Sequence, residues 1–191
     1  MKYYIITDLE WTSWKGNYTG KYKQYEKRSK KQKKEIIQIG AIKINEKFKI
    51  IKKINIYIKP RINPILSKYI IKLTGITQKT IVKKGLDFKN AFKIFSNFIK
   101  KNKIICNGSD EKIMNENLLL NLINKKVKFF NIKSILTKNY KIPEKYSSSP
   151  IIQSYFGYKI KKNKMHNALY DCISILKALR KIKFNFNLYI N

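Results

Sequence analysis

Residues 2–10 of this chain read Lys-Tyr-Tyr-Ile-Ile-Thr-Asp-Leu-Glu, and the fold is built around this stretch. The run from Lys2 to Thr7 is rich in tyrosine and isoleucine, which predicts a buried β-strand that ends at Asp8. Asp8 and Glu10 are two residues apart at this strand end, so both side chains point to one face of a sheet. Side-by-side carboxylates repel each other unless a cation separates them. The pair therefore predicts a metal site, although a polar strand terminus is the alternative interpretation of an Asp-x-Glu alone.

Two later blocks carry acids that can join this pair. Asn107-Gly108-Ser109-Asp110 follows a short buried strand expected at 104–106, and Asp110 opens a helix that runs to 122. Taken alone, Asp110 is an ordinary helix N-cap. His166-Asn167-Ala168-Leu169-Tyr170-Asp171 leads into a helix expected at 168–181 and holds the only histidine of the chain. On one continuous helix His166 and Asp171 would diverge by about 140°. If Asn167 caps the helix, His166 lies on the preceding loop and can fold back beside Asp171.

Charge is the outstanding feature of the composition. The chain has 43 Lys and Arg against 11 Asp and Glu, a formal net charge of +32. Such an excess fits a nucleic-acid partner, whose phosphates are neutralised by basic side chains. Arginine occurs at only three of the 43 positions, however, and lysine, isoleucine and asparagine have A/T-rich codons. A biased gene composition is therefore an alternative explanation. Within the polar stretch 14–35, the predicted contacts to the nucleic-acid backbone are Lys27, Arg28, Lys30 and Lys31.

The remaining pattern predicts an α/β domain. Further strands are expected at 36–44, 48–59 and 127–130, and helices at 64–73 and 87–99. Ser149 and Pro150 suggest the N-cap and first turn of a helix that ends at Gly157. The resulting order, βββαβαβα, indicates a mixed sheet flanked by helices. We expect one domain over residues 1–183 and a short apolar tail, 184–191, that packs on the domain or meets a partner.

The sequence also indicates the cellular compartment of the protein. Two cysteines are too few for a disulfide framework, and neither has metal-type spacing. There is no run of 18 or more apolar residues and no signal-peptide pattern at the start. We therefore predict a cytoplasmic protein without a membrane partner, and the sequence identifies no protein partner.

Taken together, the order and spacing of the three blocks resemble the DEDDh 3′→5′ exonucleases of the ribonuclease H-like superfamily. The intermediate blocks 35–41, 59–64 and 73–77 are most similar to the ERI-1/KapD-type branch. The resemblance covers roughly residues 2 to 182 and implies a five-stranded mixed β-sheet flanked by α-helices. It implies two divalent metal ions, Mg²⁺ or Mn²⁺, held by Asp8, Glu10, Asp110 and Asp171. His166 would be the general base, and the pocket for the terminal nucleotide would be lined by Trp11, Thr12, Leu73 and Thr74.

The leading hypothesis is thus a metal-dependent 3′→5′ exonuclease that releases 5′-mononucleotides from single-stranded ends, with RNA favoured over DNA. The first alternative is a proofreading-type DNA exonuclease that works with a polymerase. The second is a non-catalytic module that binds nucleic acid or protein on the same fold. Loss of a metal ligand is the usual sign of such a module, and here all five catalytic positions are intact.

Overall fold

A five-stranded mixed sheet forms the centre of the protein. The computed structural model describes residues 2–15 and 32–190. The strands are β1 (Tyr3–Trp11), β2 (Ile36–Asn45), β3 (Ile50–Tyr57), β4 (Lys103–Cys106) and β5 (Phe129–Asn131), in the spatial order β3-β2-β1-β4-β5. β1 pairs antiparallel with β2 and parallel with β4, β2 pairs antiparallel with β3, and β4 pairs parallel with β5. The predicted five-stranded mixed sheet is confirmed.

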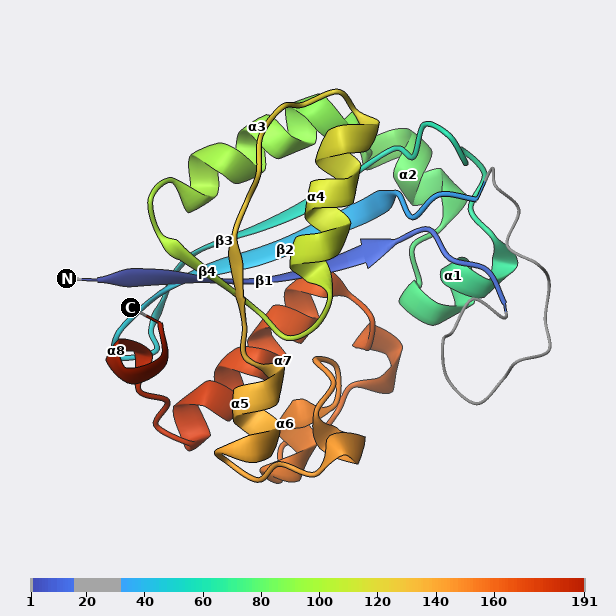
Figure 1. Ribbon diagram of the computed structural model, residues 1–191. Coiled ribbons are helices and arrows are strands. Elements are labelled where there is room, and N and C mark those ends of the chain that lie inside the picture. Colours follow the sequence, from blue (N-terminus) through green and yellow to red (C-terminus); the bar gives the residue numbers. More distant parts are fainter. Residues whose placement is uncertain (1, 16–31, 191) are drawn as a thin grey trace.

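Helices cover both faces of this sheet (Figure 1). They are α1 (Lys68–Thr74), α2 (Gln78–Lys84), α3 (Phe88–Ile99), α4 (Asp110–Leu120), α5 (Lys133–Lys138), α6 (Ile152–Tyr155), α7 (Ala168–Lys181) and α8 (Phe186–Tyr189). α3 and α4 lie on one side of the sheet, and α5, α6 and α7 lie on the other. Within the described residues, none of these helices is long and apolar enough to span a membrane.

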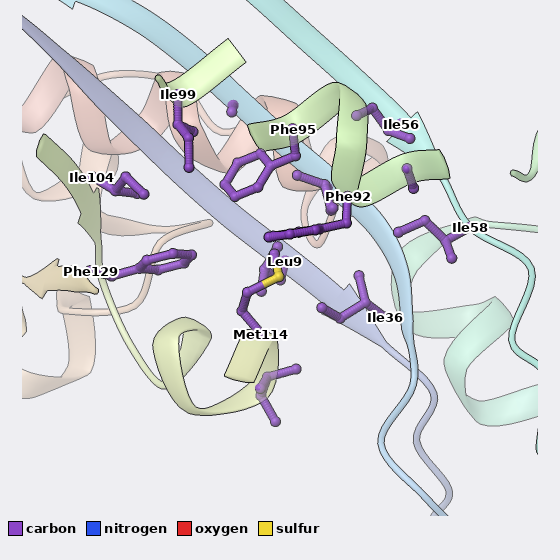
Figure 2. Close-up of a cluster of buried hydrophobic side chains, with 14 of the residues drawn as sticks. Leu9, Ile36, Ile56, Ile58, Phe92, Phe95, Ile99, Ile104, Met114 and Phe129 are labelled. Atoms are coloured by element: carbon purple, nitrogen blue, oxygen red, sulfur yellow. The ribbon is translucent and has the colours of Figure 1, made fainter. Parts of the chain in front are cut away.

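Alternation along β1 divides the core into two layers. Ile5 and Leu9 point to the side of α3 and α4, where they pack among phenylalanines and isoleucines such as Phe95 (Figure 2). Tyr4 and Ile6 point to the opposite side and pack against α5 and α7. Because side chains alternate along a strand, Asp8 and Glu10 share the face of Tyr4 and Ile6. The pattern of β1 therefore turns both acids toward α7.

The strand and helix bounds differ from prediction in several places. β1 continues past Asp8 to Trp11, so the first two acids lie within the strand, and the register shifts just after Glu10. The helix expected at 64–73 begins at Lys68, because the Ser67 hydroxyl caps it. The helix expected at 149–157 is reduced to α6. The short helices α2, α5 and α8 have no counterpart among the predicted elements.

The C-terminal segment packs onto the domain. Phe184, Phe186 and Ile190 are buried in the same core layer as α7. The Phe186 ring stacks on Tyr4 of β1, with 4.1 Å between ring centroids and an interplanar angle of 15°. α8 thereby lies beside the start of the first strand (Figure 1).

Candidate active site

Four carboxylates from three separate parts of the chain meet in one cavity. Asp8 and Glu10 lie on the face of β1 that α7 covers. Asp110 is the first residue of α4, and Asp171 lies in the first turn of α7. All four line a cavity of about 340 Å³. Each has between 1% and 8% of its surface exposed, so these charges are held away from bulk water.

Backbone contacts hold the acids in this arrangement. Asp110 Oδ1 accepts a hydrogen bond of 3.0 Å from the N–H of Leu9, the residue between Asp8 and Glu10. The helix α4 thus docks its first residue directly on the strand that carries the other two acids. On the opposite edge of β1, Asp8 is paired with Gly40 of β2.

The strand β2 positions the start of α7. A Cβ built on Gly40 would lie 2.3 Å from the carbonyl carbon of Ala168 and from the nitrogen of Leu169, so only glycine lets the helix approach this closely. Gln38 holds the same helix end, because its Oε1 accepts a 3.0 Å hydrogen bond from the Ala168 N–H. Its Nε2 donates to β3 at 2.8 Å. These contacts set the place of the first helical turn, and with it Asp171.

His166 stands on the loop before α7 and turns back toward the acids. Asn167 is the N-cap of the helix and accepts a 3.3 Å hydrogen bond from the Tyr170 N–H. His166 adopts a left-handed backbone conformation, with φ of 56°, and its backbone N–H partly offsets the rise that burial causes in the pKa of Asp171. One ligand atom each from Glu10, His166 and Asp171 lie within 4.8 Å of one another. The loop position predicted for His166 is confirmed.

Burial sets the ionisation of the whole cluster. The pKa values of Asp8 and Glu10 are raised well above their ordinary range, first by burial and then by the neighbouring carboxylates. Burial raises the pKa of Asp110 to about 6 and that of Asp171 to about 8. Burial lowers the pKa of His166, so its imidazole is neutral near pH 7 and can accept a proton.

The donor set suits hard divalent cations. Asp171 Oδ1 is buried and has no hydrogen-bond partner in the described part of the chain. An ion bound among the carboxylate oxygens would satisfy this atom and offset the repulsion between the four acids. Asp8, Glu10, Asp110 and Asp171 therefore fit a divalent-metal site.

Two of the residues predicted to bind the terminal nucleotide line the same cavity. Trp11 ends β1 and is half-buried, and Leu73 lies in the last turn of α1. The cavity therefore has apolar walls next to its acids.

The two predicted threonines make hydrogen bonds inside the protein instead. The Thr12 hydroxyl donates to the carbonyl of Lys33 at 2.7 Å and accepts from the Glu35 N–H at 2.9 Å. The Thr74 hydroxyl donates to the carbonyl of Ile70 at 2.8 Å. Both threonines are buried in the framework that supports the cavity wall. The predicted backbone contacts Lys27, Arg28, Lys30 and Lys31 lie outside the described residues.

The cavity wall also includes residues that the sequence patterns did not single out as site residues. Lys34 lies on it, with Nζ 5.9 Å from the centre of the Trp11 ring. Asn107 donates from Nδ2 to the loop before α6 at 2.8 Å. Ser149 lines the cavity as well, and its hydroxyl partly offsets the rise that burial causes in the pKa of Asp8. Asn107 stands within the second acidic block and Ser149 within a predicted helix cap, so each belongs to a recognisable sequence pattern. Neither pattern indicates that the residue lines the cavity.

Solved structures share this fold. The nuclease domain of 3′hExo, a DEDDh family member bound to rAMP, matches with a TM-score of 0.77 and 24% identity, over 95% of this chain and 91% of that one. A structure of 3′-end-specific recognition of histone mRNA stem-loop by a 3′-exonuclease matches with a TM-score of 0.76 and 22% identity, over 95% of this chain and 81% of that one. Zinc-bound E. coli ExoI in a complex with single-stranded DNA matches with a TM-score of 0.71 and 15% identity, over 99% of this chain and 42% of that one. The chain thus spans less than half of ExoI, and no curated protein matched it in sequence.

The family follows from a match along most of the sequence. The family model of the RNase T exonucleases matches residues 5–179. This stretch contains all three acidic blocks and the single histidine. With the fold confirmed, the chain belongs to the RNase T exonuclease family.

Proposed function

We propose that this protein is a metal-dependent 3′→5′ exonuclease that releases 5′-mononucleotides from single-stranded ends and prefers RNA to DNA. The observation that carries the proposal is that four buried acids and one neutral histidine line a single cavity. Membership of an exonuclease family supports the reaction class. The five intact positions argue against a non-catalytic module on the same fold.

Two divalent ions, Mg²⁺ or Mn²⁺, are proposed for the four acids. When bound, they supply positive charge at the scissile phosphate and lower the pKa of a coordinated water. Asp8 and Glu10 hold them from β1, and Asp110 and Asp171 hold them from the first turns of α4 and α7.

The protein's own proton acceptor is His166. Water forms a new bond to phosphorus while the bond from phosphorus to the 3′-oxygen breaks. The phosphate therefore leaves on the 5′-oxygen of the released nucleotide, and the 3′-oxygen takes up a proton and becomes the new 3′-hydroxyl of the shortened strand. His166 takes the proton of this water as general base, since its lowered pKa keeps the imidazole neutral near pH 7. A ligand atom of the ring lies within 4.8 Å of a carboxylate oxygen of Glu10 and of one of Asp171, so the imidazole is next to the acids.

The walls of the cavity suit the end of a single strand. Trp11 and Leu73 offer apolar surfaces on which a base can pack without its identity being read, so we expect little sequence preference. Lys34 supplies a positive charge beside them for a phosphate. Thr12 and Thr74 hold the backbone that carries Trp11 and Leu73.

The preference for RNA rests on the neighbours in fold. The structures with rAMP and with the histone mRNA stem-loop have higher TM-scores than ExoI with single-stranded DNA. A proofreading-type DNA exonuclease is the alternative, and the cytoplasmic location stays a prediction.

Competition between substrates separates the two hypotheses. RNA and DNA oligonucleotides of the same sequence, labelled with different dyes at the 5′ end, are mixed and digested in Mg²⁺ and in Mn²⁺. We expect the RNA to be shortened first. Preferred digestion of DNA, above all at a mismatched 3′ end of a duplex, contradicts the RNA proposal and favours proofreading.

A further inference from the structure

The loop in front of His166 needs hydrogen bonds to hold it in place. Its residues 159–164 are all exposed except Ile160, so packing against the core contributes little there. His166 itself has a φ of 56°, a left-handed conformation that is uncommon outside glycine and persists where the surrounding structure holds it. The contacts that fix this loop therefore determine where the histidine lies.

Contacts on both sides of His166 end on Tyr170 of α7. On one side, the Tyr170 hydroxyl accepts a 2.9 Å hydrogen bond from the N–H of Lys161. The Lys164 N–H donates to the Lys161 carbonyl at 2.8 Å, which closes the short turn between Lys161 and the histidine. On the other side, the Tyr170 N–H donates to Oδ1 of Asn167, the N-cap of the helix, at 3.3 Å. His166 is thus enclosed between two segments that one tyrosine anchors.

A buried glutamine of α6 fixes the Tyr170 hydroxyl. Gln153 is 0% exposed, and its Oε1 accepts a 2.8 Å hydrogen bond from Lys177 Nζ. An ammonium group can only donate, so the amide must present its oxygen to the lysine and its nitrogen to the tyrosine. Gln153 Nε2 accordingly donates to the Tyr170 hydroxyl at 2.8 Å. The hydroxyl therefore joins α6, α7 and the loop at one point.

We propose that Tyr170 is a positioning residue for His166, whose hydroxyl anchors to α7 the loop that carries the general base. The inference rests on the proposed function, in which His166 accepts the proton of the attacking water. Asp171 follows Tyr170 on the same helix, so the anchor ties the base to an element that carries a proposed metal ligand. A displacement of a catalytic group by about 1 Å can lower a rate about 100-fold, so the loss of this anchor should be visible in the rate.

The test uses three single variants of the full chain. Tyr170→Phe removes the acceptor of the anchoring bond and keeps the ring. Lys161→Pro removes the donor of the same bond, and the φ of −87° at this position is close to the value that proline requires. Tyr155→Phe is the matched control, because it makes the same chemical change on an exposed side chain of α6.

Four quantities are measured for each variant: kcat and KM with single-stranded RNA, Mn²⁺ affinity by calorimetry, and amide hydrogen exchange without metal or RNA. We expect Tyr170→Phe and Lys161→Pro to lower kcat by about 10- to 100-fold, with KM and Mn²⁺ affinity close to wild type. The Lys164 amide should exchange faster in both variants, and the Lys161 amide faster in Tyr170→Phe. Tyr155→Phe should match the wild type throughout.

A second background shows whether Tyr170 acts through the histidine. In His166→Ala the base is gone, so the additional change Tyr170→Phe should not lower kcat further. A tyrosine that merely stabilises the fold would lower kcat by the same factor in both backgrounds.

The proposal is overturned if Tyr170→Phe keeps the wild-type kcat, if its effect is the same in the His166→Ala background, or if Tyr155→Phe is equally slow. Loss of Mn²⁺ binding in Tyr170→Phe also overturns it, because the change then acts through Asp171. Should Tyr170→Phe not fold, Lys161→Pro is judged by the same criteria. A wild type that digests neither RNA nor DNA contradicts the proposed function, whereas unchanged amide exchange in Tyr170→Phe contradicts the anchor itself.

Discussion

At the level of single residues, the site depends on acids whose charges repel one another until a cation binds. Asp171 is the least exposed of the four, with 1% of its surface exposed and one oxygen without a hydrogen-bond partner among the described residues. Its pKa of about 8 shows how strongly burial disfavours its charge. The crowding of buried carboxylates destabilises the metal-free cluster, and the same crowding makes the cluster a good ligand set for cations.

Asp171→Asn should abolish turnover and leave the fold intact. The amide keeps the size of the side chain but removes one charge from the ligand set, so metal binding and activity are lost. Without metal, the variant should melt at the same temperature as the wild type or higher at pH 8, because a buried carboxylate has gone. Nuclease assays and thermal melts check both parts. Near-native activity in Mg²⁺ would remove Asp171 from the ligand set.

The metal-free protein should lose stability as the pH rises, relative to Asp171→Asn. The pKa of Asp171 is about 8 when folded and 3.8 at its ordinary value, so the folded state binds the extra proton in this range. The resulting contribution to stability is complete below pH 3.8 and is lost as the pH rises through 8. The melting temperature of the wild type should therefore fall progressively relative to that of the variant as the pH rises from about 4 to about 8, and the difference should level off above that. Saturating Mn²⁺ should cancel the trend, and a pH-independent difference contradicts the assigned burial effect.

His166→Ala should reduce the rate by about 10²- to 10⁴-fold, as expected for the loss of a general base. Mn²⁺ binding and RNA binding should stay close to wild type, because the four acids are still present. Rate measurements at saturating metal, together with calorimetry, separate the two roles. If metal binding is lost as well, His166 is a ligand or a support, and its assignment as base is wrong.

The acids could be predicted from sequence, but the residues that orient them could not. Asp8, Glu10, Asp110 and Asp171 belong to blocks whose order and spacing carry the resemblance. Ser149 shows the limit. The local pattern indicated a helix cap, whereas Ser149 lies on the wall of the cavity that holds the four acids, a position that only the tertiary fold creates.

At the level of helices and strands, the contact between β2 and α7 determines where the third acidic block lies. Gly40→Ala would force a methyl group against the backbone of Ala168 and Leu169. Backbone atoms cannot move aside like a flexible side chain, so we expect a loss of about 1–3 kcal/mol in the free energy of unfolding. Activity should fall further, because the displaced helix carries Asp171.

Gly108→Ala is the control for this prediction. A Cβ there would lie 3.5 Å from Asp110 Oδ2, an ordinary contact, so stability should change little. Denaturant unfolding of both variants measures the difference. Equal stability of Gly40→Ala and wild type contradicts the close packing of α7 on β2.

Long elements with a clear apolar period could be predicted, and short ones could not. α3 and α7 follow the predicted ranges closely, since each has a full apolar face. α5 spans six residues and buries Leu136 alone, too little for a periodic signal. α2 likewise buries only Ile81 and is rich in lysine. Such helices owe their existence to the surface they pack against, which the sequence does not display.

For the molecule as a whole, the central question is whether the net charge of +32 contributes to the binding of nucleic acid. Half of the acids in the described residues are buried, four of them in the cavity, which leaves few negative side chains on the surface. Ser13 and Lys34 line the cavity on either side of the segment 16–31 in sequence. The described residues on both sides of this segment in the sequence therefore lie at the site.

Neutralising Lys27, Arg28, Lys30 and Lys31 to Gln should weaken binding of long single strands. The slope of log K against log salt should fall by about 0.7 for each phosphate that these side chains no longer neutralise. Cleavage of a dinucleotide should hardly change. The matched control replaces Lys47, Lys49, Lys101 and Lys103, which are exposed near the opposite ends of the strands. Equal slopes for both variants mean that the lysine excess is a product of gene composition at these positions.

Digestion of a 5′-labelled single-stranded RNA by the wild type and by Asp171→Asn tests the proposed reaction and its metal site together. We predict a ladder that shortens from the 3′ end in Mg²⁺ or Mn²⁺ and releases 5′-mononucleotides. We also predict no ladder in EDTA, and none from the variant with any metal. Digestion that persists in EDTA, equal digestion by Asp171→Asn, or internal cleavage that ignores the 3′ end would contradict a metal-dependent 3′→5′ exonuclease built on these four acids.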